Sequence, residues 1–382
     1  MIGFELSSEQ KDWQKAARDF AEQEIKPISW KIDKGLIHGY YWPVIERMAE
    51  QGLLSMGVPK EYGGSGLDIL TMSIVVEELA VGDGGIAFTA TSNSYLPLMV
   101  AGTDEQKRAF LPVTSSREKP GLASFALTEP DAGSDGASIS TTARKEGNDY
   151  ILDGEKCFIS SGDIARLYTV IATVDKASGL KGITAFLVPD DVEGLERGKI
   201  EDKLGFRSSH TGVVVLNRVR IPEGNRLGEE GAGFRIAMKV LEVMRVISCG
   251  AIGVGIARGA YEAALRFWLT HSTSKAIISQ QAVSFDLADM LASIEACRLM
   301  VWKSSWLLDN GLPASTMSGL TKFYVSDMAM EVTNKALQLV GPCGYTEEYP
   351  LDKYIRDAKV LQIYEGTNQI SRLVASRGIV SS

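Results

Sequence analysis

The most regular β pattern in the chain is Thr211-Gly212-Val213-Val214-Val215-Leu216-Asn217-Arg218-Val219-Arg220-Ile221-Pro222. In it Val213, Val215, Val219 and Ile221 alternate with other residues, as in a strand with one buried face. Short runs rich in Val, Ile, Thr and Phe, separated by turn residues, fill the surrounding residues 119–228. Strands this close in sequence leave no room for crossover helices, so we predict a middle antiparallel β domain, built as a barrel or a sandwich.

The pattern changes to a helical period on both sides of this region. Residues 1–118 begin with Ser7 and Gln10 in capping-box spacing, and further helical patterns cover 42–53, 69–81 and 103–110, with Gly-rich breaks at 62–66 and 82–85. Residues 229–382 contain four helical stretches, at 232–269, 281–309, 315–340 and 367–378. We therefore predict an N-terminal all-α domain (1–118), the β domain (119–228) and a C-terminal four-helix bundle (229–382).

Composition excludes several classes of function. With 45% hydrophobic residues, 23% charged residues and a net charge of −8, the chain is typical of a globular protein and lacks the basic stripe that nucleic acid requires. The four cysteines are far apart and the three histidines are isolated, so we predict no metal site. The start lacks a signal-peptide pattern and no stretch approaches about 18 apolar residues, so we expect a cytoplasmic protein that does not enter membranes.

Three segments are candidates for chemistry or binding. The segment 253–259, Gly-Val-Gly-Ile-Ala-Arg-Gly, resembles a dinucleotide fingerprint but lies in a helical pattern, where small residues favour close packing. The segment 127–135 gathers hydroxyls, a Pro and a Gly at a strand end, and could be a ligand loop or an ordinary surface turn. Glu365 lies where an apolar helix end meets Gly366 and a helix that Thr367 could cap, and alone it could be an ordinary exposed Glu.

Taken together, spaced motifs resemble the acyl-CoA dehydrogenase family from end to end. The matching segments are Pro-Lys-Glu-Tyr-Gly-Gly-Ser-Gly at 59–66, Thr128 to Asp135, Lys-Cys-Phe-Ile-Ser-Ser-Gly at 156–162, Tyr-Thr-Glu-Glu-Tyr-Pro at 345–350, Arg-Asp-Ala-Lys at 356–359 and Ile-Tyr-Glu-Gly-Thr at 363–367. The resemblance implies one FAD per subunit, usually in a homotetramer. It also implies α,β-dehydrogenation of an acyl thioester, in which Glu365 removes the α-proton and the flavin accepts the β-hydride.

The resemblance further implies roles for individual residues. The backbone amide of Glu365 would hold the thioester carbonyl, an oxyanion-type contact. The residues implied to bind FAD are Leu127, Thr128, Gly133, Ser134, Phe158, Ser160, Gln338, Gly341, Thr367 and Gln369. Those implied to contact the substrate are Ser134, Glu242, Arg245, Ser92, Tyr95, Met244, Tyr364 and Gly366, with Glu242 and Arg245 near the coenzyme A nucleotide.

The sequence also departs from the family pattern. The Arg-x-x-Phe-Gly clamp that contacts the FAD pyrophosphate becomes Thr-His-Ser-Thr-Ser at 270–274, and Pro342 removes an amide donor from the motif after Gln338. Some family members carry the base on the helix around residues 242–245, where the matching residue is Met244, which cannot accept a proton. The segment 89–95 is unusually polar, and we expect a short or polar acyl group because a long chain would leave its hydroxyls unsatisfied.

Three functions remain open from the sequence. The first is an acyl-CoA dehydrogenase that passes electrons to an electron-transferring flavoprotein. The second is an acyl- or aminoacyl-carrier-protein dehydrogenase of a biosynthetic pathway. The third is a flavin-poor scaffold that binds acyl thioesters. An absorption spectrum and assays with matched thioesters of coenzyme A and carrier protein would separate them.

Overall fold

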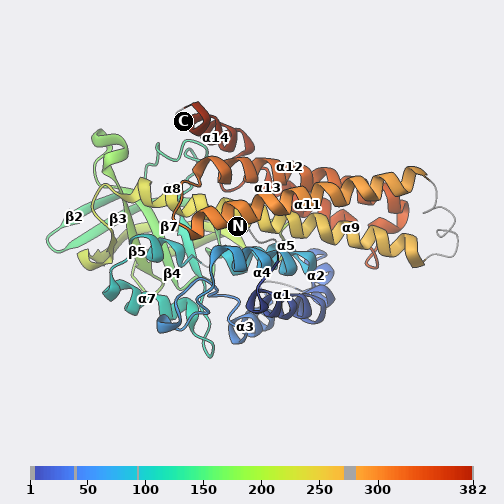
Figure 1. Ribbon diagram of the computed structural model, residues 1–382. Coiled ribbons are helices and arrows are strands. Elements are labelled where there is room, and N and C mark those ends of the chain that lie inside the picture. The colour runs from blue at the N-terminus through green and yellow to red at the C-terminus, as the bar shows by residue number, and fades with distance from the viewer. Residues whose placement is uncertain (1–4, 38–40, 93, 271–280, 381–382) are drawn as a thin grey trace.

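The protein is seen in a computed structural model that describes residues 5–37, 41–92, 94–270 and 281–380. A β-sheet forms one end, long C-terminal helices project to the other, and the N-terminal helices pack along one side (Figure 1). Helices and strands therefore follow in the predicted order α, β, α. The predicted limit at 118/119 falls between the last N-terminal helix, which ends at Ser115, and the first strand, which begins at Ala123. The limit at 228/229 falls between the last strand, which ends at Leu227, and the next helix, which begins at Gly233.

The N-terminal region is helical. Its elements are α1 (Ser8–Phe20), a π-helical turn (Ala21–Ile25), α2 (Lys26–Asp33), α3 (Trp42–Glu50), α4 (Ile69–Gly82), α5 (Gly84–Ser92), α6 (Leu96–Ala101) and α7 (Asp104–Ser115). The predicted capping box is confirmed: Gln10 N donates to Ser7 Oγ at 3.2 Å, and Ser7 N donates to the Gln10 side chain at 3.0 Å.

Some predicted helix limits were wrong. Helix α3 ends before Leu53, and α7 continues past Phe110 to Ser115. The break predicted at 82–85 is limited to Asp83, whose carboxylate accepts from Ile86 N at 2.9 Å and caps a further helix, α5. Glycines at these positions fit close packing, because a Cβ on Gly84 would lie 2.8 Å from Ile256 and Phe206.

The middle region forms one eight-stranded sheet in the order β6-β7-β3-β2-β4-β5-β8, with β1 paired to β4. The strands are β1 (Ala123–Ala126), β2 (Thr142–Glu146), β3 (Asp149–Ser160), β4 (Leu167–Thr173), β5 (Ile183–Pro189), β6 (Leu195–Ile200), β7 (Thr211–Pro222) and β8 (Arg226–Leu227). Most pairs are antiparallel, but β1 and β2 both pair with β4 in parallel. The purely antiparallel prediction was wrong here, because the β2–β3 hairpin itself supplies the connection between β1 and β4.

The alternation predicted for β7 holds for only half of the strand. Val219 and Ile221 are buried as expected, but Val214 and Leu216 are buried in place of Val213 and Val215. Asn217 and Arg218 stand opposite the single residue Asp153 of β3, which makes a β-bulge. Arg218 has φ +54° and its N–H donates to Asp153 Oδ1 at 2.8 Å. The extra residue shifts the side-chain alternation by one position.

The C-terminal region contains the four predicted helical stretches and one more helix. They are α8 (Gly233–Met244), a π-helical segment (Arg245–Ala251), α9 (Ile252–Thr270), α11 (Gln281–Asp309), α12 (Ser315–Val340), α13 (Leu351–Leu361) and α14 (Asn368–Val380). Segment 253–259 lies inside α9, where a Cβ on Gly255 would come within 2.4 Å of Glu77 O and one on Gly259 within 2.7 Å of Tyr354. These glycines serve helix packing, as predicted.

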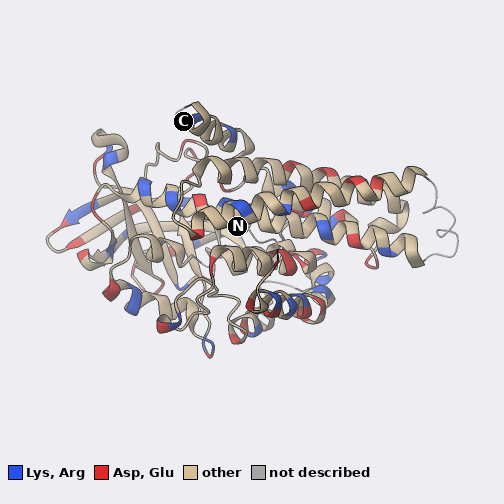
Figure 2. Cartoon of the chain, viewed as in Figure 1, with Lys and Arg blue, Asp and Glu red and all other residues tan. Residues whose placement is uncertain are grey.

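Residues 233–270 form a continuous helical segment that is long and apolar enough to cross a membrane by length and composition. The expectation that no stretch approaches the apolar length of a membrane helix was therefore wrong. In its most apolar window, 83% of the residues are buried inside the protein, as in the core helix of a globular protein. Helices α4 and α12 pack against α9. Positively and negatively charged residues are interspersed along the helices and the sheet (Figure 2).

Candidate active site

Glu365 lies in the turn between α13 and α14. Helix α13 ends at Leu361, and Thr367 begins α14 by accepting Ile370 N on its hydroxyl at 3.3 Å, so the predicted cap is confirmed. Both Glu365 (φ +56°) and Gly366 (φ +86°) have left-handed backbone conformations. A glutamate rarely adopts this conformation, and such strain concentrates at functional sites.

Arg245 holds this turn from the start of the π-helical segment. Its side chain is buried, and its Nε donates to the backbone carbonyl of Glu365 at 3.2 Å. A Cβ on Gly366 would lie 3.4 Å from the guanidinium. The predicted role of Arg245 and Glu242 in holding the coenzyme A nucleotide stays a prediction. Glu242 itself is half-buried.

The surroundings of Glu365 suit a base. Burial raises the pKa of the Glu365 carboxyl to about 7, while the charges of Arg245 and Lys322 lower it. Burial also lowers the pKa of Arg245 and of Lys322. A carboxyl with a pKa near neutrality is matched to proton transfer at neutral pH. The side chain still keeps a partial exposure to solvent, which leaves it open to a substrate.

Aromatic rings fill the space beside the turn. The ring of Tyr364 lies 5.0 Å from that of Phe88 and 6.0 Å from that of Phe206, and its hydroxyl donates to the carbonyl of Ser248. Ser248 Oγ lies 2.9 Å from Thr91 Oγ1 and 3.5 Å from Met244 Sδ. Met244, which the resemblance places at the base position of some family members, is a buried core residue next to the site.

In the polar segment 89–95, the hydroxyls of Thr89, Thr91 and Tyr95 are hydrogen-bonded within the protein. Thr89 Oγ1 donates to Gly85 O at 3.1 Å, and Thr91 Oγ1 donates to Phe88 O at 3.0 Å. Tyr95, predicted to contact the substrate, is buried, and its hydroxyl accepts from Gly57 N at 3.1 Å. Our argument that a long acyl chain would leave these groups unsatisfied was wrong, because the protein already satisfies them. The side chain of Ser92 is outside the described part of the chain.

A second bulge presents the residues predicted to flank the flavin. Between Lys156 and Ile159, two residues of β3 stand opposite one residue of β7. Phe158 has φ +55° and its side chain is 65% exposed, a rare state for so large an apolar ring. The N–H of Cys157 donates to Thr128 O at 3.0 Å, which places Thr128 beside the bulge, and Ser160 follows it as a half-buried hydroxyl. An exposed ring flanked by hydroxyls fits a flat aromatic group such as the flavin.

A buried ion pair anchors this region, and sequence reasoning missed it. Lys156 Nζ donates to Glu129 Oε1 at 2.7 Å and to Leu127 O at 3.0 Å, and both charged side chains are buried. Burial raises the pKa of Glu129, but Lys156 and the donors Ser140 and Thr141 outweigh it and leave the pKa at about 2. The pair fixes the loop at 127–135 to β3. A Glu followed in sequence by a distant Lys gives no signal of such a contact.

The remaining predicted residues lie apart from the turn or at its edge. Gly133 and Ser134 are exposed on the loop, and Gln338 is exposed near the end of α12, where Gly341 (φ +66°) stops the helix. Gln369 is exposed in the first turn of α14. The altered clamp at 270–274 lies almost entirely outside the described residues. The roles of all these residues in binding FAD remain predictions.

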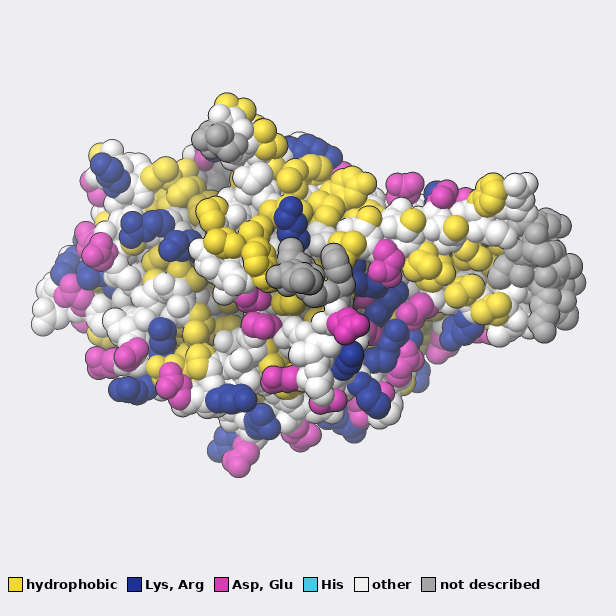
Figure 3. Space-filling model, in the orientation of Figure 1, with side chains coloured by type: hydrophobic (Ala, Val, Ile, Leu, Met, Phe, Trp, Pro, Cys, Tyr) yellow, Lys and Arg dark blue, Asp and Glu magenta, His cyan; other side chains and the backbone are white. Residues whose placement is uncertain are grey.

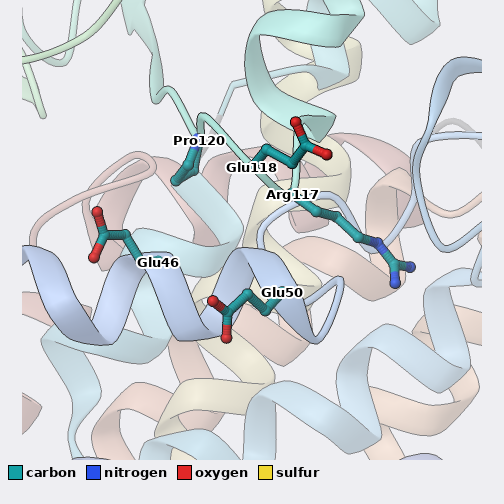
Figure 4. A pocket seen from close by; sticks show the side chains of 5 residues that line it. All are labelled: Glu46, Glu50, Arg117, Glu118 and Pro120. Carbon is teal, nitrogen blue, oxygen red and sulfur yellow. The ribbon is translucent and has the colours of Figure 1, made fainter.

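Among the described residues, neither a metal site nor a pocket rivals the Glu365 turn. Within the described residues, no group of three His, Cys, Asp or Glu side chains is arranged to hold a metal ion. An open pocket between α3 and the link after α7 is lined by Glu46, Glu50, Arg117, Glu118 and Pro120, and none of the predicted site residues borders it (Figure 4). A second, small pocket, with Ser138 and Lys176 in its wall, adjoins the loop that carries Ser134.

Comparison with known families decides the classification. Residues 7–118, 124–219 and 231–380 match the N-terminal, middle and C-terminal domains of acyl-CoA dehydrogenase. The chain belongs to the acyl-CoA dehydrogenase family. Its members are flavoprotein oxidoreductases that act on CH–CH bonds with FAD, so the predicted dehydrogenation of an acyl thioester is confirmed, as is the three-domain fold.

Individual relatives are similar to this chain over almost its whole length. The short-chain specific acyl-CoA dehydrogenase of Rattus norvegicus is 38% identical over 96% of this chain and 88% of its own. Butyryl-CoA dehydrogenase from Megasphaera elsdenii is 37% identical, with a TM-score of 0.94 over 99% and 100% of the two chains. A chain solved in a study of the electron transferring flavoprotein of Acidaminococcus fermentans is 39% identical, with a TM-score of 0.95 over 100% of both chains. The carrier-protein and scaffold alternatives are not favoured.

Proposed function

We propose that Glu365 is the base of this acyl-CoA dehydrogenase and that the substrate is a short-chain acyl-CoA. The observation that carries the first part is a carboxyl with a raised pKa on a strained turn that Arg245 holds by a hydrogen bond to the backbone. When bound, FAD supplies the acceptor for the β-hydride. The carboxylate of Glu365 takes the α-proton. The proton and the hydride are therefore accepted by different groups.

The backbone at the turn supports the carbonyl contact. In the turn, the backbone N–H groups of Ile363, Tyr364 and Asn368 donate hydrogen bonds to backbone carbonyls. The N–H of Glu365 has no such acceptor within the described residues. A free amide next to the base can donate to a thioester oxygen as negative charge develops there. Phe158, Thr128 and Ser160 would hold the flavin ring.

The short chain length rests on the relatives and on the filled space at the turn. The rat relative is a short-chain enzyme and the Megasphaera relative is a butyryl-CoA enzyme. In this chain the rings of Phe88, Phe206 and Tyr364 are packed against one another, which reduces the room beside the base.

Anaerobic reduction of the purified flavoprotein tests both parts. Butyryl-CoA should bleach the visible flavin band faster than octanoyl-CoA or palmitoyl-CoA. The variant Glu365→Gln should keep its flavin spectrum and bind butyryl-CoA, but lose roughly 10²- to 10⁴-fold or more in the rate of bleaching, the usual contribution of a general base. Preference for palmitoyl-CoA would refute the chain length, and unchanged bleaching by Glu365→Gln would refute the base.

The acceptor, the assembly and the location are also proposals. Similarity to the Acidaminococcus chain supports an electron-transferring flavoprotein as the acceptor, and reduction of that protein in the presence of butyryl-CoA would test it. Exposed apolar side chains gather where α12 to α14 lie (Figure 3) and include Tyr324, Ile363, Leu373 and Ile379, which supports a homotetramer. Light scattering should give the mass of a tetramer, and the mass of a monomer would contradict this proposal. Cell fractionation would test the cytoplasmic location.

A further inference from the structure

Lys322 is a buried cation whose presence the proposed function does not explain. It lies on α12 with no exposed surface, and its Nζ donates to Asn368 Oδ1 at 2.8 Å. Among the ion pairs of the described residues, none involves Lys322. A fully buried lysine without a paired carboxylate is unusual, because desolvation disfavours its charge.

The contact of Lys322 belongs to a network that spans the turn. Asn368 Nδ2 donates to Asp327 Oδ1 at 2.8 Å, and Gln362 Nε2 donates to the same oxygen at 2.6 Å. Asn368 N also donates to Gln362 O at 3.1 Å. Gln362 precedes the turn and Asn368 follows it, so side chains of α12 hold both of its ends.

The charged and titratable groups around Glu365 come from three elements. Arg245 and Cys249 lie on the π-helical segment, Tyr364 is its neighbour in the chain, and Lys322 approaches from α12. Asp327 on α12 is also paired with Arg372 of α14 at 2.8 Å. Arg245 is hydrogen-bonded to the backbone of the turn, and Lys322 is a second positive charge that lowers the pKa of the same carboxyl.

We propose that Lys322 is a positioning residue for the base: through Asn368 it fixes the Glu365 turn and places a buried positive charge next to that turn. This inference rests on the proposal that Glu365 is the base. The fixed turn and the positive charge both favour turnover, because the reaction needs Glu365 as a carboxylate and needs that carboxylate held at the substrate. Loss of the charge would leave more of Glu365 protonated at neutral pH.

The variant Lys322→Met, which removes the charge at similar length, tests this. The acidic limb of the profile of kcat/KM against pH should move up by about one unit, as expected for loss of a nearby opposite charge. The matched control is Lys335→Met on the same helix, where the lysine is partly exposed and paired with Glu331 only at 3.9 Å, and its profile should match that of the wild type. Asn368→Ala keeps the lysine but frees the turn, so kcat should fall at every pH.

A second measurement does not depend on turnover. The pH at which Glu365 titrates can be read by comparing the unfolding midpoints of Glu365 and Glu365→Gln proteins, in the wild-type and the Lys322→Met backgrounds. The inference requires this pH to be higher without Lys322. An unshifted titration in a folded Lys322→Met protein overturns it, and if that variant does not fold, the same comparison in Lys322→Gln decides. If wild type fails to bleach with any thioester while the titration shifts, only the proposed function fails.

Discussion

Glu365 shows how one residue departs from what its type predicts. A glutamate beside a glycine is ordinarily exposed with a pKa near 4.5, yet here burial raises its pKa to about 7 and its backbone is left-handed. The favourable contacts of the turn with Arg245 and the α12 side chains offset both costs. The site therefore holds a carboxyl whose charged form is disfavoured by burial, on a turn that these contacts keep in place.

This cost predicts a dependence of stability on pH. The folded state keeps the proton of Glu365 up to about pH 7, whereas the unfolded state releases it near 4.5. Because the folded state binds more protons in this window, ionisation lowers the free energy of unfolding as pH rises from about 4.5 to about 7. Glu365→Gln escapes the penalty, so its stability relative to wild type should increase across that window.

The advantage of Glu365→Gln should stay below about 3.5 kcal/mol, the value for a rise of the pKa from 4.5 to about 7 at about 1.4 kcal/mol for each pKa unit, because the side chain keeps some solvent contact. Denaturant unfolding at pH 4 and at pH 8 checks it. Glu223→Gln, in an exposed pair with Lys145, serves as the control and should show no such gain. A constant difference between Glu365→Gln and wild type at both pH values would contradict the prediction.

Residue by residue, the sequence predicted the groups that have a local signature. The cap at Thr367 and the capping box at Ser7 follow from short spacings, and both are present. Glu365 emerged only from the family motif. Lys322 reaches Asn368 across 46 positions of sequence and Arg245 reaches Glu365 across 120, separations that only tertiary packing bridges. No pattern along the chain indicates such contacts.

At the scale of elements, two bulges decide which side chains β3 and β7 present. The bulge at Cys157 and Phe158 turns an aromatic ring outward, and the one at Asn217 and Arg218 reverses the alternation of β7. A period of two predicts a straight strand, so it cannot locate an inserted residue. The error over Val213 and Val215 has this origin. Bulges often occur next to active sites, as the one at Phe158 does in the proposed flavin site.

Arg218 offers a test of the second bulge. Its left-handed conformation costs a non-glycine residue about 1–2 kcal/mol, so Arg218→Gly should raise the free energy of unfolding by up to about 1 kcal/mol after the entropic cost of glycine. The matched control, Arg220→Gly on the same strand, has no such strain and loses its pairs with Glu146 and Asp149. It should be destabilised. Urea unfolding of both variants that gives equal losses would refute the bulge argument.

For the whole molecule, periodicity was enough for the order of the three regions but not for their assembly. The long helices α11 and α12 were found almost to the residue, because their patterns are long. The short helices α2, α5 and α6 were missed, only the end of α13 was predicted, and the parallel pairing of β1 with β4 was missed. Short apolar helices lack a readable period, and pairing depends on strands that meet only in the folded chain.

Asp83 joins all three regions and carries the last prediction. Its buried carboxylate accepts Ser29 Oγ at 2.6 Å from α2, the hydroxyl of Ser208 from the loop before β7, and Lys353 Nζ at 2.9 Å from α13. Lys353 also pairs with Asp357, whose carboxylate accepts Phe206 N at 2.7 Å. Through Phe206, this cluster reaches the ring of Tyr364 beside the base.

Asp83→Ala should therefore lower the free energy of unfolding by about 3–5 kcal/mol, because it leaves a buried lysine short of one partner and uncaps α5. Equilibrium unfolding in urea, followed by both tryptophan fluorescence and circular dichroism, measures the loss. The exposed pair of Lys145 and Glu223 lies within the sheet region alone, so Glu223→Gln should cost no more than about 1 kcal/mol. If Asp83→Ala cost no more than Glu223→Gln, the three regions would be held together by apolar packing, and Asp83 would not be their common anchor.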